Sequence, residues 1–114
     1  MNLADKKCIP CQGGVEPFKA DKISEWLKFV APGWTNQNNH HISREVALKN
    51  FKQVIALVNQ IADLAEEQGH HPNLLIHDYK NLTISIFTHK IDGLWDSDFI
   101  LAAKIDKLIN DFKG

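Results

Sequence analysis

The spacing of apolar residues along the chain predicts three amphipathic helices. The first is expected from Asp21, a possible N-cap, to a stop at Pro32-Gly33. The second and longest carries one apolar stripe over about five turns, and Gly69 fits the C′ position that ends it. The third is expected after a cap at Asp96 or Ser97. The three stripes are Ile23, Trp26, Leu27 and Val30; then Phe51, Val54, Ile55, Val58, Ile61, Ala62 and Ala65, between Lys49 and Gln68; and then Leu101, Ile105, Leu108 and Phe112.

Between these helices the chain carries patterns typical of strands. Residues 74–79 and 82–89 alternate with a period of two on either side of Lys80-Asn81, which predicts a hairpin. A second strand pair is expected within residues 34–46, around a turn near Asn38-Asn39. In the later hairpin one face would carry Leu82, Ile84 and Ile86 and the other Thr83, Ser85, Phe87 and His89.

The order of these elements predicts the fold class α+β, with helices packed on one face of a four-stranded antiparallel sheet in a single domain. Residues 1–20 lack any sustained period and are rich in proline and glycine, so we expect an irregular arm against a domain of residues 21–114. Cys8 and Cys11 in this arm form a CxxC motif, which can be half of a zinc site or a redox pair. A second CxxC or CxxH and the elements that flank a redox motif are missing, which favours a structural or incidental role.

Composition and charge narrow the functions to consider. The chain has 114 residues, 44% of them hydrophobic, with 13 Lys and Arg against 14 Asp and Glu. Arg44 is the only arginine, so we expect no direct contact with nucleic acid. No apolar run approaches the roughly 20 residues of a membrane span, and the first thirty positions are too charged for a signal peptide. We therefore expect a cytoplasmic protein with no membrane partner.

Histidines supply the candidate chemistry. His70-His71 lies where the long helix ends, near the negative end of the helix dipole, which favours a protonated imidazole that could serve as a proton donor. Pro72 restricts His71 to an extended conformation. His89, at the end of the last predicted strand, could meet the pair around one cleft and form a proton-transfer site. Solvent-facing histidines that happen to be neighbours remain the alternative.

Other candidates carry weaker signals. Asp98 falls in the first turn of the last helix, where free amide groups stabilise a carboxylate whatever the function. His40-His41 enriches the chain in imidazoles and could suggest a metal centre, but no HExxH or facial carboxylate spacing accompanies it. We expect no catalytic metal. The P-loop, the Rossmann glycine pattern and the GxSxG motif are also missing, so nucleotide-dependent and serine-nucleophile chemistry are not supported.

Taken together, the motifs closely resemble the pterin-4a-carbinolamine dehydratase family, over nearly the whole chain. The likeness rests on Ala65-Glu66-Glu67-Gln68-Gly69-His70-His71-Pro72, Tyr79, Thr88-His89, Gly93-Leu94, and Asp98 followed by Leu101-Ala102. Gly33-Trp34, the helix near Phe51 and the Cys8-x-x-Cys11 arm with Gly13-Gly14 look like bacterial members.

The resemblance implies a reaction and a set of site residues. Members of this family dehydrate 4a-hydroxytetrahydropterin to quinonoid dihydropterin and need no metal or organic cofactor. By this likeness His70, His71 and His89 are the catalytic residues, with acid and base roles left open. The pterin substrate would be bound by Trp34 as an aromatic wall, by Pro72 and Thr88 at the pocket, and by Asp98, which would orient a histidine or the pterin. Gly69 stands where the family often has an acidic residue, so that charge is missing.

The resemblance also implies partners. We expect a homo-dimer or homo-tetramer, since an open antiparallel sheet leaves edge strands without a neighbour. Phenylalanine hydroxylase is the expected metabolic neighbour, because its pterin product would be the substrate. Two alternatives stay open: a protein-binding regulatory module of the same fold, in which the histidines are incidental, and a small metal-binding protein that uses Cys8, Cys11 and the histidines.

Overall fold

Four antiparallel strands form one sheet in the spatial order β1-β2-β4-β3. The computed structural model describes residues 2–9 and 14–112. The two central strands pair over six positions, from Ile42 opposite Ile86 to Ala47 opposite Asn81. The strands are β1 (Thr35–Gln37), β2 (His41–Ala47), β3 (Asn73–His77) and β4 (Asn81–Ile86).

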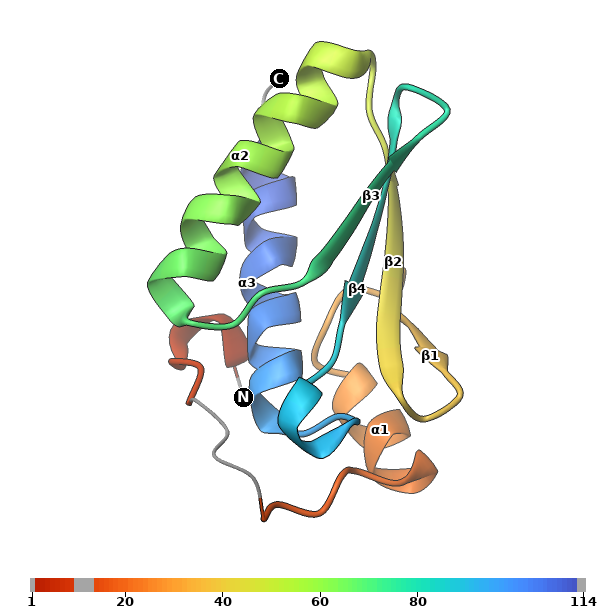
Figure 1. Cartoon of the computed structure of the whole chain (residues 1–114), viewed down its shortest axis with the longest axis vertical. Helices are drawn as coiled ribbons and strands as arrows, with labels where there is room; N and C mark the ends of the chain where they lie inside the picture. Colours follow the sequence, from red (N-terminus) through yellow and green to blue (C-terminus); the bar gives the residue numbers. More distant parts are fainter. Residues whose placement is uncertain (1, 10–13, 113–114) are drawn as a thin grey trace.

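Three helices cover one face of this sheet: α1 (Ala20–Leu27), α2 (Phe51–Gln68) and α3 (Asp96–Asp111). Figure 1 shows α2 and α3 side by side against the strands, with α1 near one end of the sheet. Helices and strands share one apolar core, which confirms the predicted single α+β domain. Fully buried members of this core include Ile23, Ile42, Leu57, Ile61, Leu82, Ile84, Ile86, Leu94, Phe99, Leu101 and Ile105. None of the described helices is long and apolar enough to cross a membrane.

The ends of α2 follow directly from its sequence. The side chain of Asn50, at the N-cap, accepts a hydrogen bond of 2.9 Å from the backbone N–H of Gln53. At the other end Gly69 adopts a left-handed φ of 64°, and its N–H donates to the carbonyl oxygen of Ala65. The predicted C-terminal glycine is therefore confirmed, and it sets the direction in which the chain leaves the helix.

The predicted caps of the other two helices are wrong. Lys19 is at the N-cap of α1, and Asp21 already lies in the first turn. Asp96 and Ser97 both lie inside α3, whose N-cap is Trp95. Acidic residues are also favoured within the first turn of a helix, because they face its free N–H groups, so a sequence pattern does not distinguish the two placements.

The first predicted hairpin is confirmed, whereas the second turns earlier than expected. Asn38 and Asn39 have φ values of 56° and 58°, and asparagine tolerates this region well. In the second hairpin Asp78 and Tyr79 take these conformations, with φ values of 51° and 53°. Strand β3 therefore ends before Tyr79, and the turn precedes the predicted Lys80-Asn81. Tyrosine is uncommon in this conformation, which explains why the pattern did not reveal the turn.

The predicted strand over residues 82–89 is also too long. Strand β4 ends at Ile86, and His89 begins a short 3-10 helix, η2 (His89–Ile91). Thr88 and Gly93 exchange backbone hydrogen bonds of 2.9 and 3.3 Å, which close this segment into a small loop. A Cβ on Gly93 would lie 2.7 Å from a side-chain carbon of Pro17. Gly93 thus allows the arm to pass close to the loop.

The arm contains more order than its sequence indicates. A 3-10 turn, η1 (Leu3–Asp5), places Leu3 in the core with 1% of its surface exposed. Lys104 of α3 donates from Nζ to the carbonyl oxygen of Ala4 at 2.8 Å. Phe18 is also buried and stacks on Phe99. The arm therefore packs against the domain near its start, through Leu3, and near its end, through Phe18.

His77 connects three strands on the side of the sheet opposite the helices. Its Nε2 lies 2.8 Å from Glu45 Oε1 and 3.0 Å from Thr83 Oγ1, and its Nδ1 lies 2.9 Å from Asp78 Oδ2. The hydrogen bond to Asp78, and then the charge of Glu45, raise the pKa of His77 above its ordinary value of 6.5. Folding therefore favours the protonated ring.

We predict that His77 stabilises the fold more at acidic than at alkaline pH. A raised folded-state pKa gives a contribution that is complete below the unfolded pKa and is lost as pH rises through the folded one. The difference in unfolding free energy between wild type and His77→Gln should shrink from about pH 5.5 to about pH 8.5 in urea titrations. A difference that stays constant or grows with pH would contradict this.

Candidate active site

The centre of the candidate site is Asp98, whose side chain is fully buried in the first turn of α3. Thr88 donates its hydroxyl to both carboxylate oxygens, at 3.0 and 2.9 Å. The backbone N–H of Trp95 donates to Oδ2 at 2.9 Å, and Nε2 of His70 lies 2.7 Å from Oδ1. A buried carboxylate is tolerated only with such partners, so these contacts fix Asp98 and the groups that face it.

His70 reaches Asp98 because of the way α2 ends. After Gly69 the backbone N–H of His70 still donates to the carbonyl oxygen of Ala65, at 3.2 Å. This contact turns the imidazole toward the start of α3, where 15% of the side chain remains exposed. With Nε2 facing a carboxylate, the neutral ring carries its proton on Nε2. Asp98 is therefore in direct contact with a histidine, and its expected role in orienting that histidine or the pterin stays a prediction.

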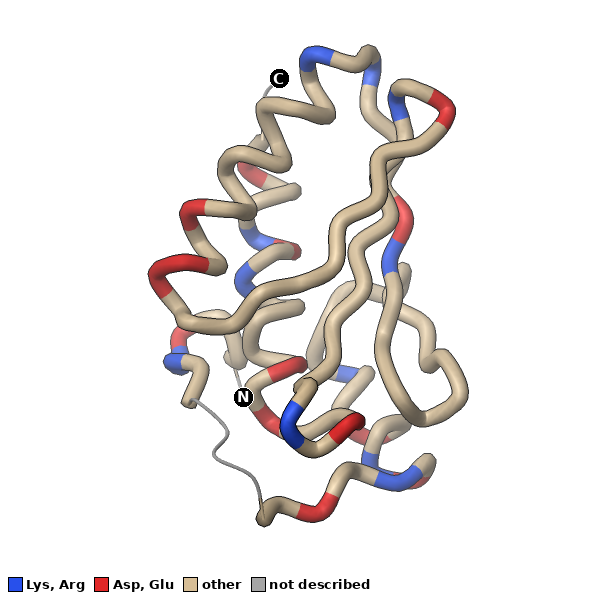
Figure 2. Tube along the Cα trace, in the orientation of Figure 1, with Lys and Arg blue, Asp and Glu red and all other residues tan. Residues whose placement is uncertain are grey.

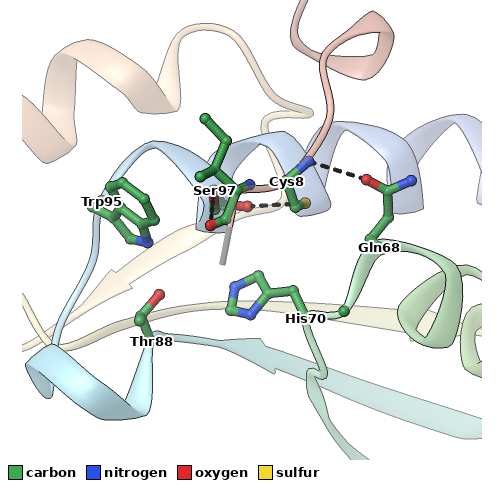
Figure 3. Close-up of a pocket in the computed structure, with 8 residues that line it drawn as sticks. Cys8, Gln68, His70, Thr88, Trp95 and Ser97 are labelled. Atoms are coloured by element: carbon green, nitrogen blue, oxygen red, sulfur yellow. Dashed lines mark hydrogen bonds between the residues drawn. The ribbon is translucent and has the colours of Figure 1, made fainter. Parts of the chain in front are cut away.

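The arm closes one side of this group. Backbone N–H of Cys8 donates to Gln68 Oε1 at 3.1 Å, and Ile9 exchanges two hydrogen bonds with the Ser97 hydroxyl, at 2.9 and 3.0 Å. Figure 3 shows Cys8, Gln68 and Ser97 beside His70. Gln68 belongs to the recognised motif and Ser97 was a candidate cap, but their contacts with the arm could not be predicted, because the partners are backbone atoms 60 and 88 residues away in the sequence.

The Cys8 thiol is kept protonated by its surroundings. Sγ lies 3.6 Å from the carbonyl oxygen of Ser97, and burial raises the pKa of Cys8 to about 11, an effect that Lys104 partly offsets. A thiol with this pKa is a poor nucleophile and a poor metal ligand near neutral pH. Cys11 lies outside the described residues, so the geometry of the CxxC motif is not described.

His71 has different surroundings from His70. Its ring is 62% exposed, and Nε2 lies 2.5 Å from Glu66 Oε2, one turn back on α2. His71 and Pro72 border a largely apolar hollow of about 330 Å³ between α2 and β3, with Leu74 on its other side. Gly69 supplies no negative charge, but each histidine of the pair contacts a carboxylate: His71 contacts Glu66 and His70 contacts Asp98. Glu66 belonged to the recognised motif but had no assigned role.

His89 lies in a third setting, at the start of η2 and exposed. Its ring packs on Phe87 with centroids 4.2 Å apart, and Phe87 also packs on His40 at 4.4 Å. His40 Nε2 lies 2.6 Å from Asp92 Oδ1, so the first hairpin is joined to the η2 loop. Burial lowers the pKa of His41, and the charge of the neighbouring His40 lowers it further. Phe87 was expected only as an outward strand residue.

The structure brings some predicted site residues together and separates others. His70 and Thr88 both contact Asp98, whereas His70 and His71 line different cavities and His89 lines neither of them. Trp34 is 3% exposed, and its indole N–H donates to Asp106 Oδ1 at 2.8 Å. Trp34 therefore lies in the core, and it does not line the hollow bordered by His71 and Pro72.

The C-terminal end of α2, next to the histidine pair, is acidic. Figure 2 shows the acidic residues of α2 toward its C-terminal end, next to the histidine pair, and its last turn contains no basic residue. Within the described residues, no group of three or more histidine, cysteine, aspartate or glutamate side chains could hold a metal ion. The site contains imidazoles, hydroxyls and carboxylates, which are groups that can transfer protons.

Comparisons with known proteins identify the family. The family model described as "Pterin 4 alpha carbinolamine dehydratase" matches residues 16–108. A relative from Alkaliphilus metalliredigens, named "Putative pterin-4-alpha-carbinolamine dehydratase", is 47% identical over 106 residues, covering 93% of this chain and 95% of that protein. A relative of the same name from Rickettsia bellii is 46% identical over 109 residues, covering 96% of each. The chain belongs to the pterin-4a-carbinolamine dehydratase family.

Solved structures support the fold. A Brucella melitensis protein described as "transcriptional coactivator/pterin dehydratase" aligns with a TM-score of 0.73 at 23% identity, covering 82% of this chain and 98% of that one. A pterin dehydratase-like protein, described as a RuBisCO assembly factor in the alpha-carboxysome, aligns with a TM-score of 0.56 at 23% identity, covering 67% and 88%. The four-stranded sheet with its helices is therefore shared by proteins described in different terms.

We predict that removing the Asp98 carboxylate destabilises the fold. Asp98→Ala leaves donors on Thr88, Trp95 and His70 without their acceptor, which should cost about 2–4 kcal/mol of unfolding free energy in urea titrations. Asp96→Ala is the matched control, because Asp96 is exposed in the same helical turn and should cost under about 1 kcal/mol. Equal losses in the two variants would show that Asp98 is only another helix-terminal charge.

Proposed function

We propose that the protein dehydrates 4a-hydroxytetrahydropterin to quinonoid dihydropterin by histidine acid/base catalysis. The dehydratase assignment of the family supports the reaction class. The observation that carries the proposal is the contact of His70 with the buried Asp98, flanked along the chain by His71 and by the Thr88-His89 pair. This arrangement holds one imidazole rigidly and leaves two others exposed to a substrate.

The proposed reaction needs two proton transfers. One proton goes to the departing 4a-hydroxyl group, and another leaves N5 of the ring. Imidazole suits both steps because it titrates near neutral pH and has a donor and an acceptor nitrogen. The proposed mechanism uses no metal or organic cofactor. Pro72 and Thr88 would shape the surface against which the pterin lies, and we leave open which histidine acts as the acid.

The proposed setting follows from the origin of the substrate. 4a-Hydroxytetrahydropterin is released by aromatic amino acid hydroxylases, so we propose a metabolic link to phenylalanine hydroxylase in the cytoplasm.

We also propose a homo-dimer or homo-tetramer, because β1 and β3 are the edges of the sheet and each pairs with one neighbour among the described residues. Sedimentation equilibrium distinguishes these states, and a monomer at micromolar concentration would contradict the proposed assembly.

A regulatory binding role is the second candidate. The Brucella melitensis structure carries the word coactivator in its description, and the other aligned structure is described as an assembly factor. In this role the same fold would present a surface to another protein, and the histidines would be incidental. The contacts of His70 and Asp98 favour the enzyme, since a binding surface has no need for a buried, oriented imidazole.

We predict that stopped-flow absorbance will show faster loss of 4a-hydroxytetrahydropterin with catalytic amounts of protein than without it. His71→Ala and His89→Ala should each lower the rate at least about tenfold, in line with the ~10²–10⁴ contributed by acid/base groups. His77→Ala is the matched control, because His77 lies at the opposite end of the hairpin and should retain the wild-type rate.

Three outcomes separate the candidates. Acceleration that is lost in both site variants and kept in His77→Ala supports the enzyme. Unchanged rates in both site variants would remove His71 and His89 from the mechanism. A folded wild-type protein that does not accelerate the reaction would contradict the dehydratase and favour the binding module.

A further inference from the structure

A small cavity lies beside His70, between the arm and the start of α3. It holds about 30 Å³ and is lined by residues from four parts of the chain, of which Figure 3 labels Cys8, Gln68, His70, Thr88, Trp95 and Ser97. By this measure a cavity needs about 10–15 Å³ to hold one water molecule. The cavity therefore has room for one or two oxygen-sized groups and none for a fused ring system.

The indole N–H of Trp95 is the unpaired donor of this cavity. Nε1 is buried and has no hydrogen-bond partner among the described residues, and no other side-chain nitrogen or oxygen in that part of the chain is both buried and unpaired. Leaving a buried donor unpaired costs about 1–3 kcal/mol, so such a group calls for an explanation. An acceptor that enters the cavity would recover this cost.

The hydroxyl and thiol groups of the cavity are already engaged within the protein. The Thr88 hydroxyl donates to Asp98, the Ser97 hydroxyl donates to the carbonyl oxygen of Ile9, and the Cys8 thiol faces the carbonyl oxygen of Ser97. The occupant must therefore accept a hydrogen bond from Trp95, which requires an oxygen or nitrogen lone pair. A hydroxyl group or a water molecule meets this requirement and fits the volume.

The position of Trp95 in the helix explains how its side chain is free for this purpose. An N-cap side chain usually accepts a hydrogen bond from the first turn, which is why serine, threonine, aspartate and asparagine are preferred there. Tryptophan cannot accept such a bond. In α3 the Asp98 carboxylate instead receives the backbone N–H of Trp95, at 2.9 Å. The helix start is thus tied down by Asp98, and the indole can face the cavity.

We propose that the cavity receives the hydroxyl group that leaves the pterin, and that Trp95 donates a hydrogen bond to its oxygen. This inference rests on the proposed dehydration. In that step the protonated ring of one of the three site histidines, His70, His71 or His89, gives its proton to the hydroxyl group. The C4a–O bond then breaks with its electrons on oxygen, and water departs. A base removes the N5 proton, and the electrons of that N–H bond form the N5=C4a double bond. The indole N–H stabilises the oxygen as the bond breaks.

The test compares Trp95→Phe with Trp26→Phe, a matched control in which the lost indole packs on Phe18 and Phe99 away from the cavity. Removing a donor aimed at full developing charge costs about 10²–10³ in rate, and less is expected for an oxygen that is being protonated. Trp95→Phe should therefore lower kcat about tenfold, whereas Trp26→Phe should change it less than twofold. Affinity for a tetrahydropterin without the 4a-hydroxyl, measured by calorimetry, should be the same in all three proteins.

A second variant separates the lost donor from lost packing. Trp95→His restores a ring N–H and should recover part of the rate, and thermal melting identifies any variant that is not folded. If Trp95→Phe keeps the wild-type kcat, the cavity holds a resident water only and the proposal is overturned. Weaker binding of the hydroxyl-free pterin would also overturn it, because the indole would then contact another part of the ring. A wild-type protein without dehydratase activity refutes the proposed function, and this assignment with it.

Discussion

A carboxylate that is removed from water has to be given hydrogen-bond donors, and Asp98 receives its donors from three separate parts of the chain. Thr88 comes from the loop after β4, Trp95 from the start of α3 and His70 from the end of α2. None of these segments could shift without leaving a buried charge unpaired, which is costly. The carboxylate therefore fixes the relative positions of the end of α2, the η2 loop and the start of α3.

The proposed chemistry depends on this arrangement. One imidazole, on His70, is held by a buried partner, while His71 and His89, both later in the sequence, remain exposed. The arm adds a further wall, because Ser97 holds Ile9 next to the cavity through paired hydrogen bonds. Rigid support on one side and open imidazoles on the other suit a reaction that moves two protons and releases water.

The sequence predicted those parts of the molecule that depend on local pattern. Apolar periodicity located all three helices and the sheet. The sequence also correctly predicted that Gly69 ends α2, because few residues other than glycine adopt its left-handed conformation easily. The motif also identified His70, Thr88 and Asp98, which the fold brings into contact. What it missed depends on tertiary approach. No local pattern could predict that the arm lies beside His70, that Trp34 lies in the core or that the Trp95 indole faces a cavity.

The most direct test of this account is the position of the proton on the His70 ring. Nitrogen-15 NMR of the histidine-labelled protein, at a pH of about 8 where a histidine of ordinary pKa is neutral, reports which ring nitrogen carries the proton. His70→Gln assigns the signal by its loss. Because Nε2 faces Asp98, the account predicts a proton on Nε2 and a bare Nδ1. A proton on Nδ1, or the mixture typical of a histidine free in solvent, would contradict the claim that Asp98 orients this histidine.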